Sequence, residues 1–304
     1  MVVGPLVQLI ESIGQLLVDR RVEPAALQDE LRDRFRIAGT AGLVGEAIGG
    51  LDMTLWDAFA KALDVPLRKV LGATTKPTRV YESMGMMSPD ETRAEAVAAA
   101  ETGVTAFKVK AGHPDESRDR ANVEVLREVA GKTGEVMLDF NQAFTPYEAI
   151  QRLHRLEDLR PAWIEEPVAA ADLPGHALVR QATSVPVQTG ENWGTPRDME
   201  TALRLGACDL VMIDAVRIGG VTGWMRCAAV AQAHSVPLST HFYPEFSVHT
   251  MCASPTAQYI EWLDVSSAIV ASPLEVKLGA VEPPDRPGAG LAWNEAAVAR
   301  FALT

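Results

Sequence analysis

The chain has 304 residues, of which 47% are hydrophobic and 22% are charged, a mixture that suits a large folded core and excludes disordered and fibrous classes. Its formal charge of −12 argues against nucleic acid as a partner, because phosphate binding needs a basic stripe on the surface. The three cysteines, Cys208, Cys227 and Cys252, form no CxxC pair, so we expect reduced, buried thiols in a cytoplasmic protein.

The first part of the chain is predicted to be helical. The apolar run over residues 1–10 ends at Glu11 and lacks a basic region and a cleavage site, so we interpret it as an amphipathic helix and not as a signal peptide. Helical spacing extends over residues 5–36, with a break at the Glu-Pro pair 23–24, and a further helix is predicted over residues 42–63. No apolar run reaches the roughly 18 residues of a membrane span.

Apolar residues at helical spacing predict which faces of these helices are buried. On the first helix they are Leu6, Ile10, Ile13, Leu16 and Leu17. On the helix over residues 42–63 they are Leu51, Leu55, Phe59 and Leu63. The pair Gly49-Gly50 would allow this second helix to pack closely against a neighbour.

From residue 78 onward, short apolar or β-branched runs alternate with helical segments, about 20–30 residues apart, which is the length of a βα unit. The eight runs cover residues 79–83, 105–110, 135–140, 162–166, 185–189, 209–214, 236–240 and 257–262. Eight such units predict a closed parallel (β/α)₈ barrel of the TIM type, whereas a doubly wound open sheet fits less well because no nucleotide-binding fingerprint is present. We expect a helical segment over residues 1–77, the barrel over 78–281 and a closing segment over 282–304.

Ionisable side chains stand where the predicted strands end, which is where a barrel of this kind builds its active site. In chain order they are Lys108, Lys110, Asp139, Glu165, Glu191, Asp214, His241 and Glu261, with Asn141 close behind Asp139. Any one of them alone would be read as a helix cap, a turn former or a satisfied structural side chain. Their occurrence on successive strands favours a common site.

Three carboxylates on successive strands, Asp139, Glu165 and Glu191, predict a metal site. Neighbouring strand ends lie close enough for the three groups to converge on one cation, which would compensate their charge. A set of oxygen ligands suits Mg²⁺ and leaves positions for substrate or water. Zn²⁺ would call for His or Cys ligands, and none cluster with these residues.

Two basic groups flank the predicted metal site, Lys110 from strand two and His241 from strand seven. Asp214 on strand six would fix the tautomer of His241 and raise its basicity. Lys108 points to the same interior as Lys110, where a second cation would lower the pKa of Lys110 and let it act as a base. Two bases on opposite sides of one substrate predict proton removal from one face and delivery to the other.

At these residues the sequence resembles the mandelate racemase branch of the enolase superfamily, over nearly the whole chain from about residue 40. Seven strings occur in that family's order: TAFKVKAG, VMLDFNQAF, WIEEPV, VPVQTGENW, MIDAVRIGGVTGW, LSTHF and AQYIEWLD. The closing DRPGAGLAW and the helix GGLDMTLWDAFAKALDVPL also resemble segments of the family. Seven strings in the right order make the resemblance specific.

The resemblance implies that Mg²⁺, with Mn²⁺ as a substitute, is bound by Asp139, Glu165 and Glu191. It implies that Lys110 is the base for one enantiomer of the substrate and that His241, held by Asp214, is the base for the other. These roles follow a pattern known for this superfamily, a Lys or His base beside Mg²⁺ that stabilises an enediolate.

The remaining roles concern the substrate. The resemblance implies that Glu261 is a protonated acid that hydrogen-bonds the enediolate, so we expect its pKa to be raised by nearby carboxylates and apolar walls. Lys108 and Ser83 would contact the substrate carboxylate, and Asn141 would support the site. Met84 follows Ser83 where the namesake of the family has a histidine, which predicts different substrate contacts.

The resemblance also concerns the segment that covers the site. The family ordinarily starts with a small β-meander, and this sequence shows none before its helices, which would then belong to an incomplete capping domain. Without that cover the site would be open to water. We further expect a homo-oligomer, since octamers are common in the family, and neither a nucleic acid nor a membrane partner.

Three functions remain open on the sequence. Racemisation of a 2-hydroxy carboxylate through an enediolate, with mandelate as one example, is favoured by the paired bases. The alternative is an acid-sugar dehydratase, which expels a β-hydroxyl with His241 as general acid and needs a polar pocket, whereas Met84, Met86, Met87 and Phe242 suggest an apolar one. The third is a non-catalytic barrel kept for binding.

Overall fold

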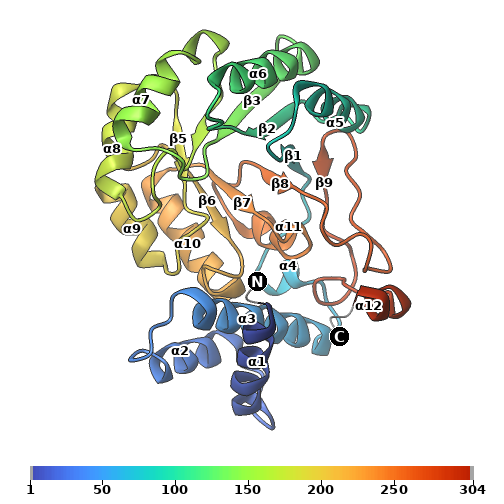
Figure 1. Cartoon of the computed structure of the whole chain (residues 1–304). Helices are drawn as coiled ribbons and strands as arrows, with labels where there is room; N and C mark the ends of the chain where they lie inside the picture. The colour runs from blue at the N-terminus through green and yellow to red at the C-terminus, as the bar shows by residue number, and fades with distance from the viewer. Residues whose placement is uncertain (1–2, 302–304) are drawn as a thin grey trace.

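Eight parallel strands form a barrel with helices around its outside and a layer of further helices at one end, as Figure 1 shows. This computed structural model describes residues 3–301. The strands are β1 (Thr78–Met84), β2 (Ala106–Lys110), β3 (Glu135–Asp139), β4 (Ile164–Glu165), β5 (Val187–Thr189), β6 (Leu210–Asp214), β7 (Leu238–His241) and β8 (Ile260–Trp262). The predicted (β/α)₈ barrel is confirmed, and each strand lies within or within one residue of its predicted run.

The strands follow the order β7-β6-β5-β4-β3-β2-β1-β8, and the ends of this row meet to close the barrel. Three backbone hydrogen bonds close it: the Leu238 amide donates to the Thr256 carbonyl at 2.9 Å, the Gln258 amide to the Leu238 carbonyl at 2.8 Å, and the Thr240 amide to the Tyr259 carbonyl at 3.0 Å. A short strand, β9 (Ala280–Val281), pairs antiparallel with β1.

The helices that surround the barrel follow their strands along the chain. They are α5 (Pro89–Glu101), α6 (Glu116–Ala130), α7 (Pro146–His154), α8 (Leu173–Ala182), α9 (Pro196–Arg204), α10 (Gly220–His234) and α11 (Pro244–Ala253), with a 3₁₀ turn at Glu157–Leu159. Three of them begin at capping boxes whose first residues are Ser88, Thr145 and Thr195. These capping boxes provide hydrogen-bond acceptors for backbone amides that are otherwise unpaired at the start of a helix. They therefore fix the residue at which each loop after a strand ends and the helix begins.

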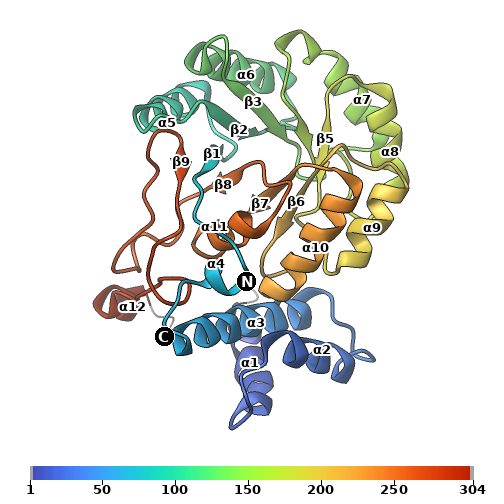
Figure 2. The same cartoon turned by 180° about the vertical axis from the view of Figure 1, so that it is seen from behind.

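The helical layer contains α1 (Val3–Gly14), a 3₁₀ turn at Gln15–Leu17, α2 (Pro24–Arg34), α3 (Gly42–Ala62) and α4 (Leu67–Val70), and the chain closes with α12 (Glu295–Phe301). Figure 2 shows α2 and α3 directly below α10. The predicted break before residue 24 and the predicted start at residue 42 are confirmed. The segments predicted over 1–77 and 282–304 include residues 1–2 and 302–304, which lie outside the described residues. Within residues 3–301 no helix is long and apolar enough to cross a membrane.

The buried face of α3 differs in part from the prediction. Leu51 packs against a buried cluster as predicted, but Leu63, just past the end of α3, is 54% exposed, and α3 also buries Ala47, Ile48 and Met53. The reason is that α3 packs against three helices, α1, α2 and α10. Small residues on several sides of α3 are therefore buried, in addition to one apolar stripe. The predicted close packing at Gly49 is confirmed, because a Cβ atom there would lie 2.0 Å from the Val216 carbonyl oxygen.

The interior of the barrel changes from aromatic to charged along the strands. Tyr81, Trp163 and Tyr259 fill one layer, with ring centroids 5.7 Å apart between Tyr81 and Trp163 and 5.9 Å apart between Tyr81 and Tyr259. The Lys108 ammonium lies 5.2 Å from the centre of the Tyr81 ring, at the boundary with the charged residues. The functional side chains lie at the strand ends, and the aromatic layer packs beneath them inside the barrel.

Candidate active site

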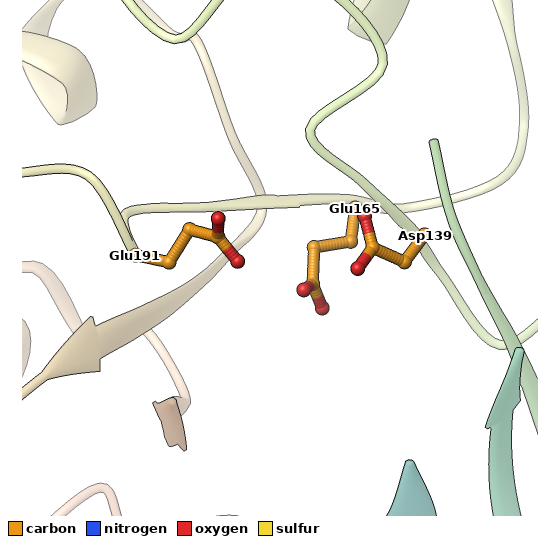
Figure 3. Close-up of side chains that lie close together, drawn as sticks. All are labelled: Asp139, Glu165 and Glu191. Carbon is orange, nitrogen blue, oxygen red and sulfur yellow. The ribbon is translucent and has the colours of Figure 1, made fainter. Parts of the chain in front are cut away.

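The three carboxylates predicted to bind a metal converge. Strand register places Lys110 beside Asp139 and Asp139 beside Glu165. One oxygen from each of Asp139, Glu165 and Glu191 lies within 4.8 Å of the others, and all three residues are buried. Figure 3 shows Asp139 and Glu165 close together, with Glu191 turned toward them from the opposite side.

The triad has the chemistry of a divalent cation site. Burial raises the pKa of Glu165 well above its ordinary value; the charge of Lys108 opposes this rise, and the charges of Asp139, Glu261 and Glu191 add to it. The site therefore needs more positive charge than Lys108 supplies. Three oxygen donors on protein side chains fit Mg²⁺, which keeps its other positions for water or substrate.

Lys108 is buried among carboxylates. Its Nζ lies 2.6 Å from Glu165 Oε1, 2.7 Å from Glu261 Oε1 and 3.8 Å from Asp139 Oδ2. Burial alone would lower the pKa of Lys108, but these negative charges raise it well above its usual value. The ammonium is surrounded by the protein's own carboxylates, and its charge holds Glu165 and Glu261 in place. Its expected contact with a substrate carboxylate stays a prediction.

The pKa of Glu261 is lowered in this structure, contrary to the expected rise. Burial raises its pKa, but the charges of Lys108 and His241 and hydrogen bonds from Lys108 and Ser83 outweigh burial and lower the pKa to about 2. The Ser83 hydroxyl donates to Glu261 Oε1 at 2.7 Å, and the Phe242 amide donates to Oε2 at 3.1 Å. Ser83 and Glu261 are thus brought together as predicted, with Ser83 buried against its partner.

His241 and Asp214 form the predicted pair on one flank of the triad. His241 Nδ1 lies 2.8 Å from Asp214 Oδ2, and His241 Nε2 lies 3.3 Å from Glu191 Oε2. Asp214 Oδ1 accepts from the backbone amides of Val216 and Arg217, which fixes its orientation. Burial lowers the pKa of His241, but the hydrogen bond to Asp214 and the charges of Glu261 and Glu191 raise it above its ordinary value.

Lys110 lies on the other flank. Its Nζ is 3.2 Å from Asp139 Oδ2 and also donates to Asn141 Oδ1, and its side chain is 39% exposed. Asn141 adopts a left-handed backbone with φ of 42°, and its amide donates to Asp139 Oδ1 at 2.8 Å. The turn after β3 therefore places Asn141 against both the base and a metal-site carboxylate, as predicted for a supporting residue.

Sequence reasoning missed residues that hold the triad from outside. Glu166 is buried, has a φ of 40° and accepts from Asn192 Nδ2 at 2.8 Å. Burial raises the pKa of Glu166 to about 7. Gln188 Nε2 donates to Glu165 Oε2 at 3.0 Å, and Arg217 Nη1 donates to the Glu191 carbonyl at 3.1 Å. The adjacent glutamates Glu165 and Glu166 could have indicated from the sequence that Glu166 belongs to the site. The Arg217 contact joins the ends of two different strands, and no sequence pattern indicates it.

Of the residues that suggested an apolar pocket, Phe242 lines a cavity beside Asp214. Met84 is buried in the hydrophobic core outside the site, and Met86 is 53% exposed. A cavity of about 230 Å³ opens beside Asp214. Its lining is mostly polar or aromatic: Glu46, Asp214, Val216, Arg217, Phe242, Tyr243 and Val265.

Comparison with known proteins identifies the family. Residues 91–297 match the family described as enolase C-terminal domain-like. The chain is 31% identical over 262 residues to the L-talarate/galactarate dehydratase of Salmonella typhimurium, which covers 85% of this chain and 66% of that protein. It is 32% identical over 275 residues to the 3,6-anhydro-alpha-L-galactonate cycloisomerase of Streptomyces coelicolor, covering 89% of this chain and 76% of that protein.

A solved structure extends the likeness to the whole chain. The structure of an enolase from Bradyrhizobium, complexed with magnesium and mandelic acid, matches with a TM-score of 0.96 and 42% identity, covering 100% of this chain and 84% of that one. The chain spans just under two thirds of the Salmonella dehydratase, and neither curated relative is a mandelate racemase. The match over residues 91–297, together with the barrel and its acidic triad, shows that the chain belongs to the enolase superfamily.

Proposed function

We propose that the chain is a Mg²⁺-dependent acid-sugar dehydratase, which removes the α-proton of a 2-hydroxy carboxylate and expels the neighbouring β-hydroxyl as water. The observation that carries the proposal is the placement of Lys110 and His241 on the two flanks of one acidic triad. The relative named as a dehydratase supports this net reaction over racemisation, which was the first hypothesis from the sequence, and the relative named as a cycloisomerase supports a sugar-acid substrate.

Asp139, Glu165 and Glu191 would hold the metal. When bound, Mg²⁺ supplies positive charge that stabilises the second negative charge of the enediolate. Lys108 keeps Glu165 and Glu261 oriented, since its ammonium contacts both at 2.6–2.7 Å. These residues prepare the site before the substrate arrives, so little reorganisation is needed during the reaction.

Lys110 and His241 would move the two protons. Neutral Lys110 accepts the α-proton, and the electrons of the broken C–H bond form a C=C bond. Protonated His241 donates to the β-hydroxyl, whose C–O bond breaks to release water. The resulting enol takes up a proton at the β-carbon and loses its hydroxyl proton, which gives a 2-keto-3-deoxy acid. Asp214 stabilises the protonated imidazole through its 2.8 Å contact with Nδ1.

The cavity beside Asp214 supports a hydroxylated substrate. Glu46 offers acceptors, while Arg217 and the Tyr243 hydroxyl offer donors, in a space of about 230 Å³. A polyol chain needs both kinds of partner, because each buried hydroxyl must keep its hydrogen bonds. Glu46, Arg217 and Tyr243 are thus polar partners of the kind that a dehydratase requires, beside the apolar side chains of the same cavity.

Racemisation is the second candidate. It uses the same pair, with Lys110 acting on one enantiomer and His241 on the other. The Bradyrhizobium structure with mandelic acid is the observation in its favour, at 42% identity to this chain.

The test is a panel of substrates in D₂O with Mg²⁺: galactarate, L-talarate, D-gluconate and both enantiomers of mandelate. Proton NMR follows the α-proton, and a carbonyl assay follows keto acid. The variants Lys110→Ala and His241→Asn are compared with Lys132→Ala, which alters an exposed lysine after α6. A keto acid from an acid sugar supports dehydration. Exchange or inversion of mandelate without keto product supports racemisation, and no exchange with any substrate while Mg²⁺ binds contradicts both.

A further inference from the structure

The loop that carries Glu191 is held from several directions. This metal-ligand loop, residues 190–195, connects β5 to α9 and contains no regular secondary structure. On its inner side Asp198 accepts from the amides of Gly194 and Thr195 at 3.0 and 2.8 Å. On its outer side Arg217 donates to the Glu191 carbonyl at 3.1 Å. Neither contact involves the helical layer.

A third contact comes from the helical layer, far away in sequence. Arg32 on α2 donates through Nη2 to the Gly194 carbonyl at 2.9 Å. Its neighbour on α2, Gln28, donates to the Gly219 carbonyl at 3.0 Å, in the loop that follows Asp214 and Arg217. Two side chains one turn apart on α2 therefore bind the loops of both Glu191 and Asp214.

Arg32 is an unusual choice for a purely structural contact. It is half-buried, and burial lowers its pKa, yet within residues 3–301 no carboxylate lies close enough to form an ion pair with it. Among the described residues, the Gly194 carbonyl is the hydrogen-bond acceptor of the Arg32 side chain. The neighbouring Arg226 is different, because it pairs with both oxygens of Asp29 at 2.7 and 2.8 Å.

We propose that Arg32 is a positioning residue for the metal site: by binding the Gly194 carbonyl it fixes the metal-ligand loop and, through that loop, the direction of Glu191. Gly194 is held on both sides, with its amide on Asp198 and its carbonyl on Arg32. Loss of the Arg32 contact leaves the loop attached at Asp198 and Arg217 but free to tilt at Gly194. Three ligands must share one cation at fixed distances, so a tilt at Glu191 weakens binding of the metal.

The inference rests on the proposed metal ligands and not on the acid-sugar substrate, so it is tested by Mg²⁺ binding alone. Isothermal titration of the purified chain with MgCl₂ is compared for the wild type, Arg32→Met and Arg226→Met. Arg226→Met is the control, because it removes contacts of α10 with Asp29 and Gln28 on α2 and has no contact with the metal-ligand loop. Thermal unfolding of each variant without Mg²⁺ measures any loss of stability.

We expect Arg32→Met to weaken Mg²⁺ binding about three- to tenfold, less than the 10- to 100-fold typical of groups that touch a ligand directly. Arg226→Met should lower the Tm and leave the Mg²⁺ Kd unchanged. Arg217→Met, which removes the contact with Glu191 itself, should weaken binding more than Arg32→Met. If Arg32→Met does not fold, Arg32→Gln replaces it, since its shorter amide does not reach Gly194.

The proposal is overturned if Arg32→Met binds Mg²⁺ as tightly as the wild type, or if Arg226→Met weakens binding equally. A wild type that binds no Mg²⁺ overturns the metal site and this inference together. Normal Mg²⁺ binding without turnover of any acid sugar contradicts only the proposed substrate. The Mg²⁺ Kd of Arg32→Met then still tests the proposed role of Arg32.

Discussion

The two flanks of the acidic triad hold their basic groups in opposite ways. His241 is 8% exposed in its side chain and is bound at both ring nitrogens, by Asp214 at 2.8 Å and Glu191 at 3.3 Å. Lys110 is 39% exposed in its side chain and contacts Asp139 and Asn141 at the edge of the site. One base is enclosed and rigid, and the other is partly open to solvent.

The difference fits the proton-transfer role proposed for each group. An imidazole has two nitrogens, and it can act as an acid or a base only if its tautomer and ring direction are fixed. A lysine must lose its proton before it can accept another, and contact with water allows that proton to be transferred to solvent. The rigid flank is therefore expected to be more sensitive to changes in its supports than the open flank.

The largest effect is expected on removing either proton-transferring group. Lys110→Met and His241→Asn should each lower kcat for the acid-sugar substrate by about 10³-fold or more, within the range known for general acid–base groups. Steady-state kinetics of keto acid formation measure this, with Lys132→Met as the matched lysine control. Activity near the wild-type level in either variant would show that the flank in question does not transfer a proton.

A smaller effect is expected on removing the supports, and it should differ between flanks. Asp214→Asn should lower kcat by about 10²-fold, because it leaves His241 without its charged partner. Asn141→Ala should cost about tenfold, since Lys110 keeps Asp139 as a neighbour at 3.2 Å. The ratio of the two kcat values is the measurement. Equal losses would contradict the contrast between a rigid and an open flank.

Metal binding is expected to join the two flanks, because Asp139 touches Lys110 and Glu191 touches His241. At a Mg²⁺ concentration of 100 times Kd, the folded state should gain about 2.7 kcal/mol, seen as a rise in Tm. Addition of EDTA should reverse the rise. Glu191→Gln should abolish most of it, and a full Tm rise in that variant would exclude Glu191 as a ligand.

The smallest effect concerns a carboxyl group on the outside of β1, which lacks the partners that both flanks possess. Burial, with the charges of Glu95 and Asp264, raises the pKa of Glu82 to about 7. Its protonated form favours the folded state, so this stability is complete below about pH 4.5 and is lost as the pH rises through 7. Glu82→Gln should therefore be more stable than the wild type at pH 8, by about 1–2 kcal/mol after allowance for partial exposure.

Chemical denaturation at pH 5 and pH 8 measures this gain. The two proteins should differ little at pH 5, where Glu82 is protonated when folded. A gain of the same size at both pH values would show that ionisation of Glu82 is not the cause. Glu95→Gln serves as a comparison, because its carboxyl is less deeply buried and should respond more weakly.

The sequence was a good guide to elements and to the residues at strand ends. The regular spacing of the βα units predicted all eight strands. The end of a strand can be recognised from nearby residues, and this placed Asp139, Glu165 and Glu191 at one edge of the barrel. Capping boxes at Ser88 and Thr195 are likewise local. Such features depend on residues close in the chain, and they can be found without the fold.

What could not be predicted depends on contacts between distant segments. Whether Lys108 faces a substrate or Glu261 depends on strands β2 and β8, which meet β1 from opposite sides. The pKa of Glu261 follows from that contact, and the expectation of a raised value was wrong for this reason. The contact of Arg32 with Gly194 spans 162 residues, and no spacing in the sequence indicates it.

Gly49 connects the helical layer to the rigid flank. Its missing side chain lets α3 approach the backbone of Val216, two residues after Asp214, so closely that a single methyl group would have to push one of them away. A mutation at this position would therefore first disturb the hydrogen bonds that orient Asp214, and through Asp214 the position of His241. A change in the first sixth of the chain would thus act as a change in the active site, although it touches no substrate.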